Sequence, residues 1–260
     1  MIFDQSEFEI RCEWGENGVA QLAPFSDVVI IVDVLSFSTC VEIATSRGAV
    51  VFPYQWKDRS AQNFATSMGA ELADRRNSGS RHKLSPASMT QIPNHTRLVL
   101  PSPNGSTLSL KTGKTPTLAG CLRNSRAIAA AATAYGKRIA VIPAGEKWED
   151  DSLRPSFEDW VGAGAILSHL KGNVSSEAQA AIAVYQTAQS NLKSLLKQCS
   201  SGKELTEKGF EQDVDLAAEL DVSDCVPTLV DSLFINGEVK RLDELVGGAL
   251  DLLHESGNAP

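Results

Sequence analysis

Three short stretches of the chain combine carboxylates, hydroxyls and amides in patterns that could handle a phosphate ester. The first follows the apolar run VVIIV and consists of one acid and three hydroxyl residues: Asp33, Ser36, Ser38 and Thr39. Hydroxyls and amides at the start of a helix suit a phosphate group, and a carboxylate suits a divalent cation or nucleophilic attack. A helix cap with one acid bound to a loop explains the same residues, so this stretch alone favours neither interpretation.

The second stretch is the turn SPNGST, which follows the apolar run RLVLP. An Asn-Gly pair such as Asn104-Gly105 usually marks a simple turn. Hydroxyls on both sides, Ser106 among them, also make it a backbone nest that could hold an anion. On local sequence the simple turn is the favoured interpretation.

The third stretch begins with PAGE (143–146), continues through an acid-rich loop and ends with Glu158 and Asp159. Two acids in the first turn of a helix interact favourably with the helix dipole, which is a sufficient structural reason for them. Beside the other two stretches they would instead be oxygen ligands for magnesium, which usually takes only one or two protein carboxylates.

Buried strands must position these stretches. Residues 28–34, 97–102 and 138–145 are largely apolar runs, typical of strands covered on both faces. Alternation over residues 7–14 predicts a half-buried strand. Helical spacing predicts a partly helical C-terminal tail and helices over 38–47, 60–72, 124–135, 156–170, 176–198 and 213–220. This order favours a parallel or mixed α/β sheet, whose ligands bind at the carboxyl ends of the strands. We expect a single domain over residues 1–260.

Composition is that of an ordinary folded protein, with 260 residues, 42% hydrophobic residues and a net charge of −8. The acidic balance argues against a dedicated nucleic-acid-binding protein. Residues 57–138 hold 13 basic residues against three acids, while the rest of the chain holds 11 against 29. A basic segment between acidic flanks hints at anion binding beside metal-binding carboxylates, and unevenly spread surface charge is the alternative.

Cellular location follows from the cysteines and the apolar runs. None of the five cysteines forms a C-x-x-C pair, which indicates neither a zinc site nor a disulfide framework and favours a reducing cytoplasm. The first residues contain no apolar signal-peptide segment, and no apolar run is long enough to span a bilayer. We therefore expect a cytoplasmic protein with no membrane and no nucleic-acid partner.

Several known phosphatase and nucleotide-binding motifs are missing from the sequence. A Cys-based phosphatase needs C-x-x-x-x-x-R, but six residues separate Cys40 from Arg47 and four separate Cys121 from Arg126. Aspartyl-nucleophile phosphatases place a second aspartate two residues after the first, where this chain has Leu35. No G-x-x-x-x-G-K-[ST] loop, G-x-G-x-x-G fingerprint or G-x-S-x-G elbow occurs.

Four segments, in their order along the chain, resemble the 2-phosphosulfolactate phosphatase family. They cover residues 28–49, 100–109, 124–129 and 141–167, and a weaker match follows over 205–229. The resemblance implies a magnesium-dependent phosphomonoester hydrolase with a three-layer α/β/α fold around a mixed, largely parallel sheet. It also implies the conversion of 2-phosphosulfolactate to 3-sulfolactate and phosphate, a step towards coenzyme M or related sulfonates.

The same resemblance suggests roles for individual residues. Asp33 and Glu158 are the candidate catalytic residues, and together with Asp159 they are the candidate magnesium ligands. The candidate substrate-binding residues are Ser36, Ser38, Thr39, Asn104, Gly105, Ser106, Asn124 and Arg126. Either water or the first aspartate attacks phosphorus. We expect a small anionic phosphorylated substrate and, as for many small metabolic enzymes, a homodimer.

One departure from the family concerns the substrate. The family commonly has an arginine where this chain has Ser36. An arginine there would bind a phosphate or sulfonate through two parallel hydrogen bonds. We predict that Arg123 or Arg126 supplies the missing charge. The departure leaves two alternatives open: a protein on the same fold that binds an anionic metabolite without turnover, and a phosphatase for another phosphorylated metabolite.

Overall fold

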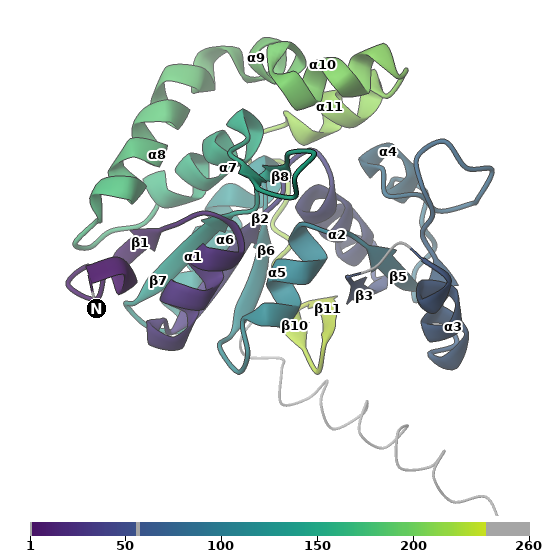
Figure 1. Ribbon diagram of the computed structural model, residues 1–260, viewed down its shortest axis with the longest axis horizontal. Helices are drawn as coiled ribbons and strands as arrows, with labels where there is room; N and C mark the ends of the chain where they lie inside the picture. The colour runs from purple at the N-terminus through teal and green to yellow at the C-terminus, as the bar shows by residue number, and fades with distance from the viewer. Residues whose placement is uncertain (1, 56–57, 238–260) are drawn as a thin grey trace, which may run out of the picture.

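The computed structural model describes residues 2–55 and 58–237. Within them, nine strands form one sheet in the order β1-β7-β2-β6-β10-β11-β3-β5-β4 (Figure 1). These strands are β1 (Ile10–Cys12), β2 (Val28–Val32), β3 (Val50–Tyr54), β4 (Glu71–Leu72), β5 (Arg97–Pro101), β6 (Thr117–Gly120), β7 (Ile139–Pro143), β10 (Pro227–Val230) and β11 (Leu233–Asn236). The predicted helical tail, residues 238–260, lies outside the described residues, and so does that end of the predicted 1–260 domain.

The sheet consists of two parallel blocks joined by an antiparallel hairpin. Strands β1, β7, β2 and β6 pair in parallel, and so do β3, β5 and β4. The β10–β11 hairpin lies between the blocks and pairs antiparallel with β6 on one side and with β3 on the other. The sheet is therefore mixed and largely parallel, as predicted.

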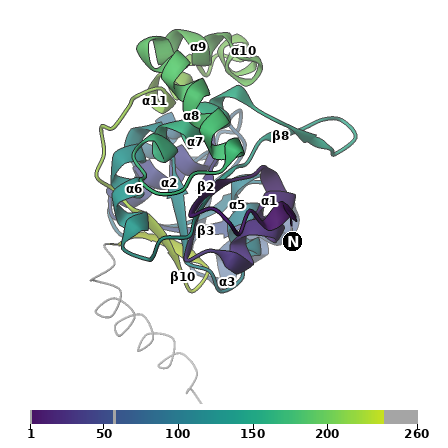
Figure 2. The same cartoon turned by 90° about the vertical axis from the view of Figure 1, so that its left-hand side faces the viewer.

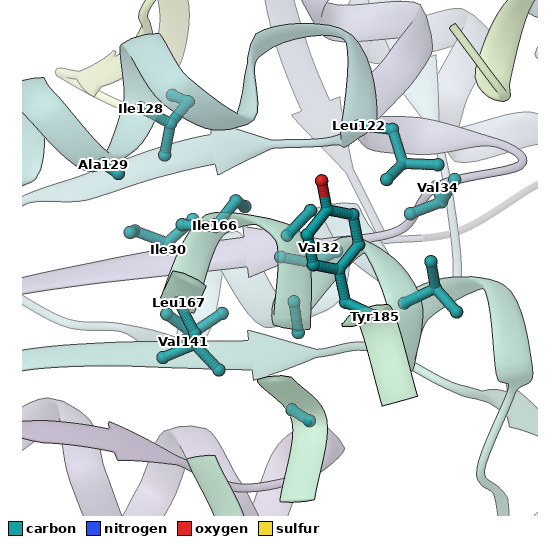
Figure 3. Close-up of a cluster of buried hydrophobic side chains, with 14 of the residues drawn as sticks. Ile30, Val32, Val34, Leu122, Ile128, Ala129, Val141, Ile166, Leu167 and Tyr185 are labelled. Atoms are coloured by element: carbon teal, nitrogen blue, oxygen red, sulfur yellow. The ribbon is translucent and has the colours of Figure 1, made fainter. Parts of the chain in front are cut away.

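Helices cover both faces of this sheet. They are α1 (Gly15–Leu22), α2 (Phe37–Ser46), α3 (Arg59–Ser67), α4 (Pro86–Met89), α5 (Gly105–Lys111), α6 (Ser125–Thr133), α7 (Phe157–Ser168), α8 (Ser176–Ala188), α9 (Leu192–Gln198), α10 (Ser200–Glu207) and α11 (Glu211–Ala217). Strand β2 shows the reason, because successive side chains of a strand point to opposite faces. Ile30 and Val32 pack with α7 (Figure 3), whereas Val29 and Ile31 pack with α1 and α5. The predicted three-layer α/β/α fold is confirmed.

Several predicted elements differ in extent from the observed ones. The strand expected over residues 7–14 is only the fully buried β1, not a half-buried strand. The helix expected over 60–72 ends at Ser67, because Gly69 takes a positive φ of 57°, and β4 follows. The helix expected over 176–198 is divided into α8 and α9. Strand β6, helix α10 and the β10–β11 hairpin were not predicted.

Two smaller features complete the architecture around the carboxyl ends of β2 and β7. Helices α9, α10 and α11 lie together at one end of the molecule (Figure 1). A two-stranded hairpin of β8 (Glu146–Lys147) and β9 (Leu153–Arg154) follows β7 and projects from the body of the molecule (Figure 2). Within the described range, no helix has both the length and the apolar composition needed to cross a membrane. All five cysteines are free thiols.

Candidate active site

Asp33 joins the turns that follow two strands of the sheet. It comes directly after β2 and is only 4% exposed. Its Oδ1 accepts a hydrogen bond from Phe37 N at 3.2 Å, and its Oδ2 accepts one from Gly105 N at 3.0 Å. These amides belong to the first residues of α2 and α5, so the partial positive charge of two helix ends meets the carboxylate. The turn after β5 thus meets the end of β2.

Asp159 holds the ends of β2 and β7 against the start of α7. Its Oδ1 accepts a hydrogen bond from Val34 N at 2.7 Å, and its Oδ2 accepts from Gly145 N at 2.9 Å and from Ser156 Oγ at 2.8 Å. The residue is buried. Burial raises the pKa of Asp159 well above its ordinary value, and the negative charges of Asp33 and Glu158 raise it further.

Two glutamates complete a cluster of four carboxylates. Glu158 is buried, and the Cys199 thiol donates a hydrogen bond to its Oε2 at 3.3 Å. Glu146 accepts a hydrogen bond from Asn104 Nδ2 at 2.9 Å. Burial raises the pKa of Glu146 to about 7, and the charges of Asp33 and Glu158 act in the same direction. Carboxyl groups whose pKa values are raised by burial and by neighbouring negative charges, as those of Glu146 and Asp159 are, are common at functional sites.

Sequence reasoning did not name Glu146 as a site residue. The signal that could have found it is its position, since it lies three residues after the buried strand β7 and begins the β8–β9 hairpin. The neighbouring acids Glu158 and Asp159 are more conspicuous in the sequence because they are adjacent and begin a helix.

A cavity of about 680 Å³ is lined by one carboxylate of the cluster, Glu146, whereas Asp33, Glu158 and Asp159 lie outside its lining. Two of the predicted substrate-binding residues, Ser36 and Asn104, line it, and so does Glu146. Among the other lining residues, five carry a positive charge: Arg75, Arg76, Lys147, Arg154 and Lys208. The acids in the lining are Glu146 and Glu204. The cavity wall therefore favours an anionic ligand.

The predicted hydroxyl residues Ser38, Thr39 and Ser106 are buried and bond the backbone of their own turns. Ser38 Oγ donates to Ile31 O at 3.0 Å, Thr39 Oγ1 to Val34 O at 2.5 Å, and Ser106 Oγ to Leu100 O at 2.9 Å. None of the three is in the cavity lining. Their hydroxyls thus hold the turns in place, and Gly105 reaches the site through its backbone N–H to the aspartate.

The structure places the predicted Asn124 and Arg126 away from the cavity lining. Asn124 is fully buried, and its Oδ1 accepts from Cys121 N while its Nδ2 donates to Cys225 O. The Arg126 side chain is 63% exposed and pairs at 3.9 Å with Asp224. Neither residue lines the cavity.

Arg123 does not supply the charge that is missing at Ser36 either. It forms ion pairs with Glu42, at 2.6 Å, and with Glu219. The structure does not bring Arg123 or Arg126 to the cavity lining beside Ser36, and each pairs with acids elsewhere. The arginine beside Ser36 is instead Arg76, whose Nη2 donates to the preceding carbonyl, that of Leu35, at 2.7 Å.

The cluster provides oxygen ligands of the type magnesium prefers, without a preformed cage. In the described part of the chain, no three His, Cys, Asp or Glu side chains are arranged to hold a metal ion. Both oxygens of Asp159 already accept hydrogen bonds, and so do both oxygens of Asp33, although a carboxylate oxygen that accepts one hydrogen bond keeps a second lone pair. Asp33 and Glu158 fit a magnesium ion that binds through one or two carboxylates and keeps several waters. The assignment of magnesium to these residues stays a prediction.

The chain is similar in sequence to several named phosphatases. Among named relatives, the 2-phosphosulfolactate phosphatase of Methanothermobacter thermautotrophicus is 27% identical over 148 residues, which span 57% of this chain and 60% of that protein. The probable 2-phosphosulfolactate phosphatase of Thermotoga petrophila is 36% identical over 83 residues, 32% of this chain and 37% of that protein. That of Gloeobacter violaceus is 38% identical over 72 residues, 28% of this chain and 30% of that protein.

The aligned segments thus span less than two thirds of each of these relatives. The family itself matches much more of the chain. The sequence pattern of the 2-phosphosulpholactate phosphatase family extends over residues 18–232, which include every strand from β2 to β10 and all four carboxylates of the cluster. The chain belongs to the 2-phosphosulpholactate phosphatase family.

Proposed function

We propose that this protein is a magnesium-dependent phosphatase that hydrolyses 2-phosphosulfolactate to 3-sulfolactate and phosphate. The observation that carries the proposal is a cluster of four carboxylates, one of which, Glu146, lines a cavity together with five cationic side chains. Family membership supports the same substrate. 2-Phosphosulfolactate carries a carboxylate and a sulfonate besides its phosphate ester. The cationic side chains of the cavity attract such an anion, and the carboxylates of the cluster suit a divalent cation.

The residues of the cluster have separate tasks in this proposal. Asp33 and Glu158 would hold magnesium, which when bound supplies positive charge to the phosphate oxygens. The Asn104–Gly105 turn keeps Asp33 in place through the Gly105 amide. Burial raises the pKa of Glu146, which favours its protonated form, and a protonated Glu146 can pass its proton to the leaving oxygen. The attacking group is either the Asp33 carboxylate or a water molecule.

The test is phosphate release from 2-phosphosulfolactate by the purified protein. We expect release with magnesium, loss of release with EDTA, and recovery on renewed addition of magnesium. Asp33→Asn should lower the rate by about a hundredfold or more, because removing a pre-positioned charged group from an active site typically costs this much. Asp27→Asn is the matched control, since it makes the same change just before β2, where Asp27 pairs with Arg138 on the surface.

Two outcomes would contradict the proposal at different levels. No phosphate release by the wild-type protein with magnesium present would exclude the activity. A folded Asp33→Asn variant with full activity would retain the activity but exclude the role of Asp33. A weaker chelator at the same pH and concentration is the control for EDTA, because it changes the ionic strength similarly but removes less magnesium. Loss of release with EDTA alone would then indicate metal removal.

A non-catalytic binding protein is the second candidate, and one observation favours it: Ser36 stands where the family commonly has an arginine. Calorimetry with 2-phosphosulfolactate and magnesium, run alongside the release assay, separates the two functions. Binding without release would favour the binding protein. Release from another phosphate ester, but not from 2-phosphosulfolactate, would indicate a phosphatase for a different metabolite.

We also infer a cytoplasmic location and a homodimer. The free thiols are those of a protein that works in a reducing compartment. Supply of sulfolactate to coenzyme M or a related sulfonate is the expected context of the reaction. Sedimentation of the purified protein measures the oligomeric state.

A further inference from the structure

We propose that Arg76, positioned by Asp213, binds an oxyanion group of the substrate beside the Leu35–Ser36 turn. The proposal rests on the proposed function for the identity of the ligand. It adds a substrate-binding residue from the segment between β4 and α4. The oxyanion belongs either to the transferred phosphate or to the carboxylate or sulfonate of the same molecule.

Two fixed contacts hold the Arg76 guanidinium at the cavity wall. Its Nε donates to Asp213 Oδ2 at 2.9 Å, and its Nη2 donates to Leu35 O at 2.7 Å. The side chain is 18% exposed and lines the cavity together with Leu35 and Ser36. A guanidinium has five N–H donors, so two contacts to the protein leave donors for a planar oxyanion.

Asp213 is itself fixed by its surroundings. It is 1% exposed, and its Oδ1 accepts from Ser85 Oγ at 2.6 Å and from Ala87 N at 2.9 Å. Helix α11 thereby connects to the start of α4 and to Arg76 through one buried carboxylate. A buried and hydrogen-bonded carboxylate holds a guanidinium in one orientation, which lowers the entropy cost of binding a ligand.

The other cations of the cavity are less well prepared for a ligand. Lys208 pairs with Glu204, which also lines the cavity. Lys147 and Arg75 are exposed. Arg154 is partly buried and rests over the Trp148 ring, 5.6 Å from its centroid, on the projecting β8–β9 hairpin. Arg154 also donates to Ser201 Oγ at 3.1 Å, but Arg76 is the cation that is held by a buried carboxylate and that bonds Leu35, two residues after Asp33.

The experiment measures binding and turnover in the same variants. Calorimetry with 3-sulfolactate, which retains the carboxylate and sulfonate, and with inorganic phosphate is expected to show that Arg76→Ala weakens binding of one of these two ligands by about ten- to hundredfold, as expected for the loss of hydrogen bonds to a charged group. Arg76→Lys should recover part of this affinity, because lysine keeps the charge but not the two-pronged geometry. Arg81→Ala is the matched control: Arg81 lies in the same segment but is exposed and outside the cavity lining.

Turnover then identifies which oxyanion is bound. An increase in KM for 2-phosphosulfolactate in Arg76→Ala, with no increase for phenyl phosphate, assigns the carboxylate or sulfonate. An equal increase for both substrates assigns the transferred phosphate. Arg76→Ala also leaves Asp213 buried without its ion-pair partner, so the double variant Arg76→Ala/Asp213→Asn is measured as well, with thermal unfolding to verify that each protein is folded.

Failure of this proposal differs from failure of the proposed function. Unchanged 3-sulfolactate affinity and unchanged KM values in folded Arg76→Ala would overturn the role of Arg76, while wild-type phosphate release would still support the phosphatase. Conversely, Arg76-dependent binding of 3-sulfolactate by a wild-type protein that releases no phosphate would exclude the phosphatase and leave the binding role intact.

Discussion

Adjacent carboxylates in this site differ in what their surroundings do to them. Asp159 accepts hydrogen bonds from two backbone amides and a hydroxyl, whereas Glu158 receives one from a thiol. Glu146 receives one from an amide side chain and is surrounded by negative charge. Asp159 therefore holds the backbone together, whereas Glu158 and Glu146 remain able to bind a ligand or a proton.

The raised pKa of Glu146 predicts how stability depends on pH. Its folded-state pKa is about 7 against an ordinary value of 4.5, so the folded protein binds more protons than the unfolded chain between these values. The free energy of unfolding should therefore fall as the pH rises from about 4.5 to 7, by about 3 kcal/mol in the limit. Below this range the contribution of Glu146 is constant, and above it the loss is complete.

Urea unfolding with EDTA present, between pH 5 and pH 8, measures this dependence. Glu146→Gln should flatten it, because glutamine keeps the acceptor for Asn104 but carries no titrating proton. The raised pKa of Asp159 acts in the same direction, so a smaller slope remains in the variant. Identical slopes in the two proteins would show that Glu146 is not destabilised in its charged form.

At the residue scale, the sequence was a good guide to acids and a poor guide to hydroxyls. Asp33, Glu158 and Asp159 were predicted and do lie together. Ser38 and Ser106 were predicted as phosphate ligands, but their hydroxyls bond strand carbonyls. A short hydroxyl side chain binds its own backbone as readily as a ligand, and the pattern is the same in both cases.

At the element scale, the carboxyl end of β2 is held by a single side chain from α7. Asp159 satisfies the amides of Val34 and Gly145, which follow β2 and β7, and both amides are buried. Asp159→Asn should destabilise the protein by about 1–3 kcal/mol, because an amide nitrogen facing a buried N–H leaves that donor unpaired. Glu158→Gln, one residue away, should change stability much less, since its carboxylate bonds no backbone amide among the described contacts.

Urea unfolding of the two variants tests this division directly. Both variants are expected to lose activity, so only their free energies of unfolding distinguish them. Equal losses of stability would mean that the hydrogen bonds of Asp159 do not hold the strand ends together.

Elements with a strong local pattern were predicted, and elements that depend on distant partners were not. Strands β2, β5 and β7 are apolar runs, and their positions follow from composition alone. Strands β6, β10 and β11 are four residues each. Strand β6 gains its hydrogen bonds from strands far away in the sequence, and the β10–β11 hairpin is joined to β6 and β3 only by such distant pairs. The rule that ligands bind at the carboxyl ends of parallel strands applied to β2 and β7. The rule does not explain why the turn after β5 meets the end of β2, because the block that contains β5 is joined to the block that contains β2 through antiparallel pairs.

At the scale of the whole molecule, the fold brings the basic middle of the chain to its acidic flanks. Asn104 and Arg76 come from the basic segment, and they meet Glu146 and Leu35 from the flanks. The charge pattern along the sequence predicted this meeting but not the individual residues. Arg123, Arg126 and Arg138 belong to the same basic segment and form ion pairs away from the cavity lining.

The β10–β11 hairpin is the connection on which the integrity of the sheet depends. It provides the only pairing, within the described residues, between the block that carries Asp33 and the block that leads into Asn104. Phe234 of β11 is fully buried, pairs with Val51 of β3, and meets the Phe37 ring edge-on with centroids 5.9 Å apart. Phe234→Ala should therefore destabilise both blocks, by about 3–5 kcal/mol as for other buried aromatic residues.

Hydrogen exchange resolved to single strands measures whether the two blocks lose stability together. Because the hairpin pairs with both, the opening free energies of the amides in β2 and in β5 should fall by the same amount in Phe234→Ala, as expected for one cooperative domain. Phe3→Ala is the matched control, since Phe3 is 74% exposed and its removal creates no cavity. A fall confined to β5, with β2 unchanged, would mean that the sheet consists of two separately folding parts and that the single-domain prediction is wrong.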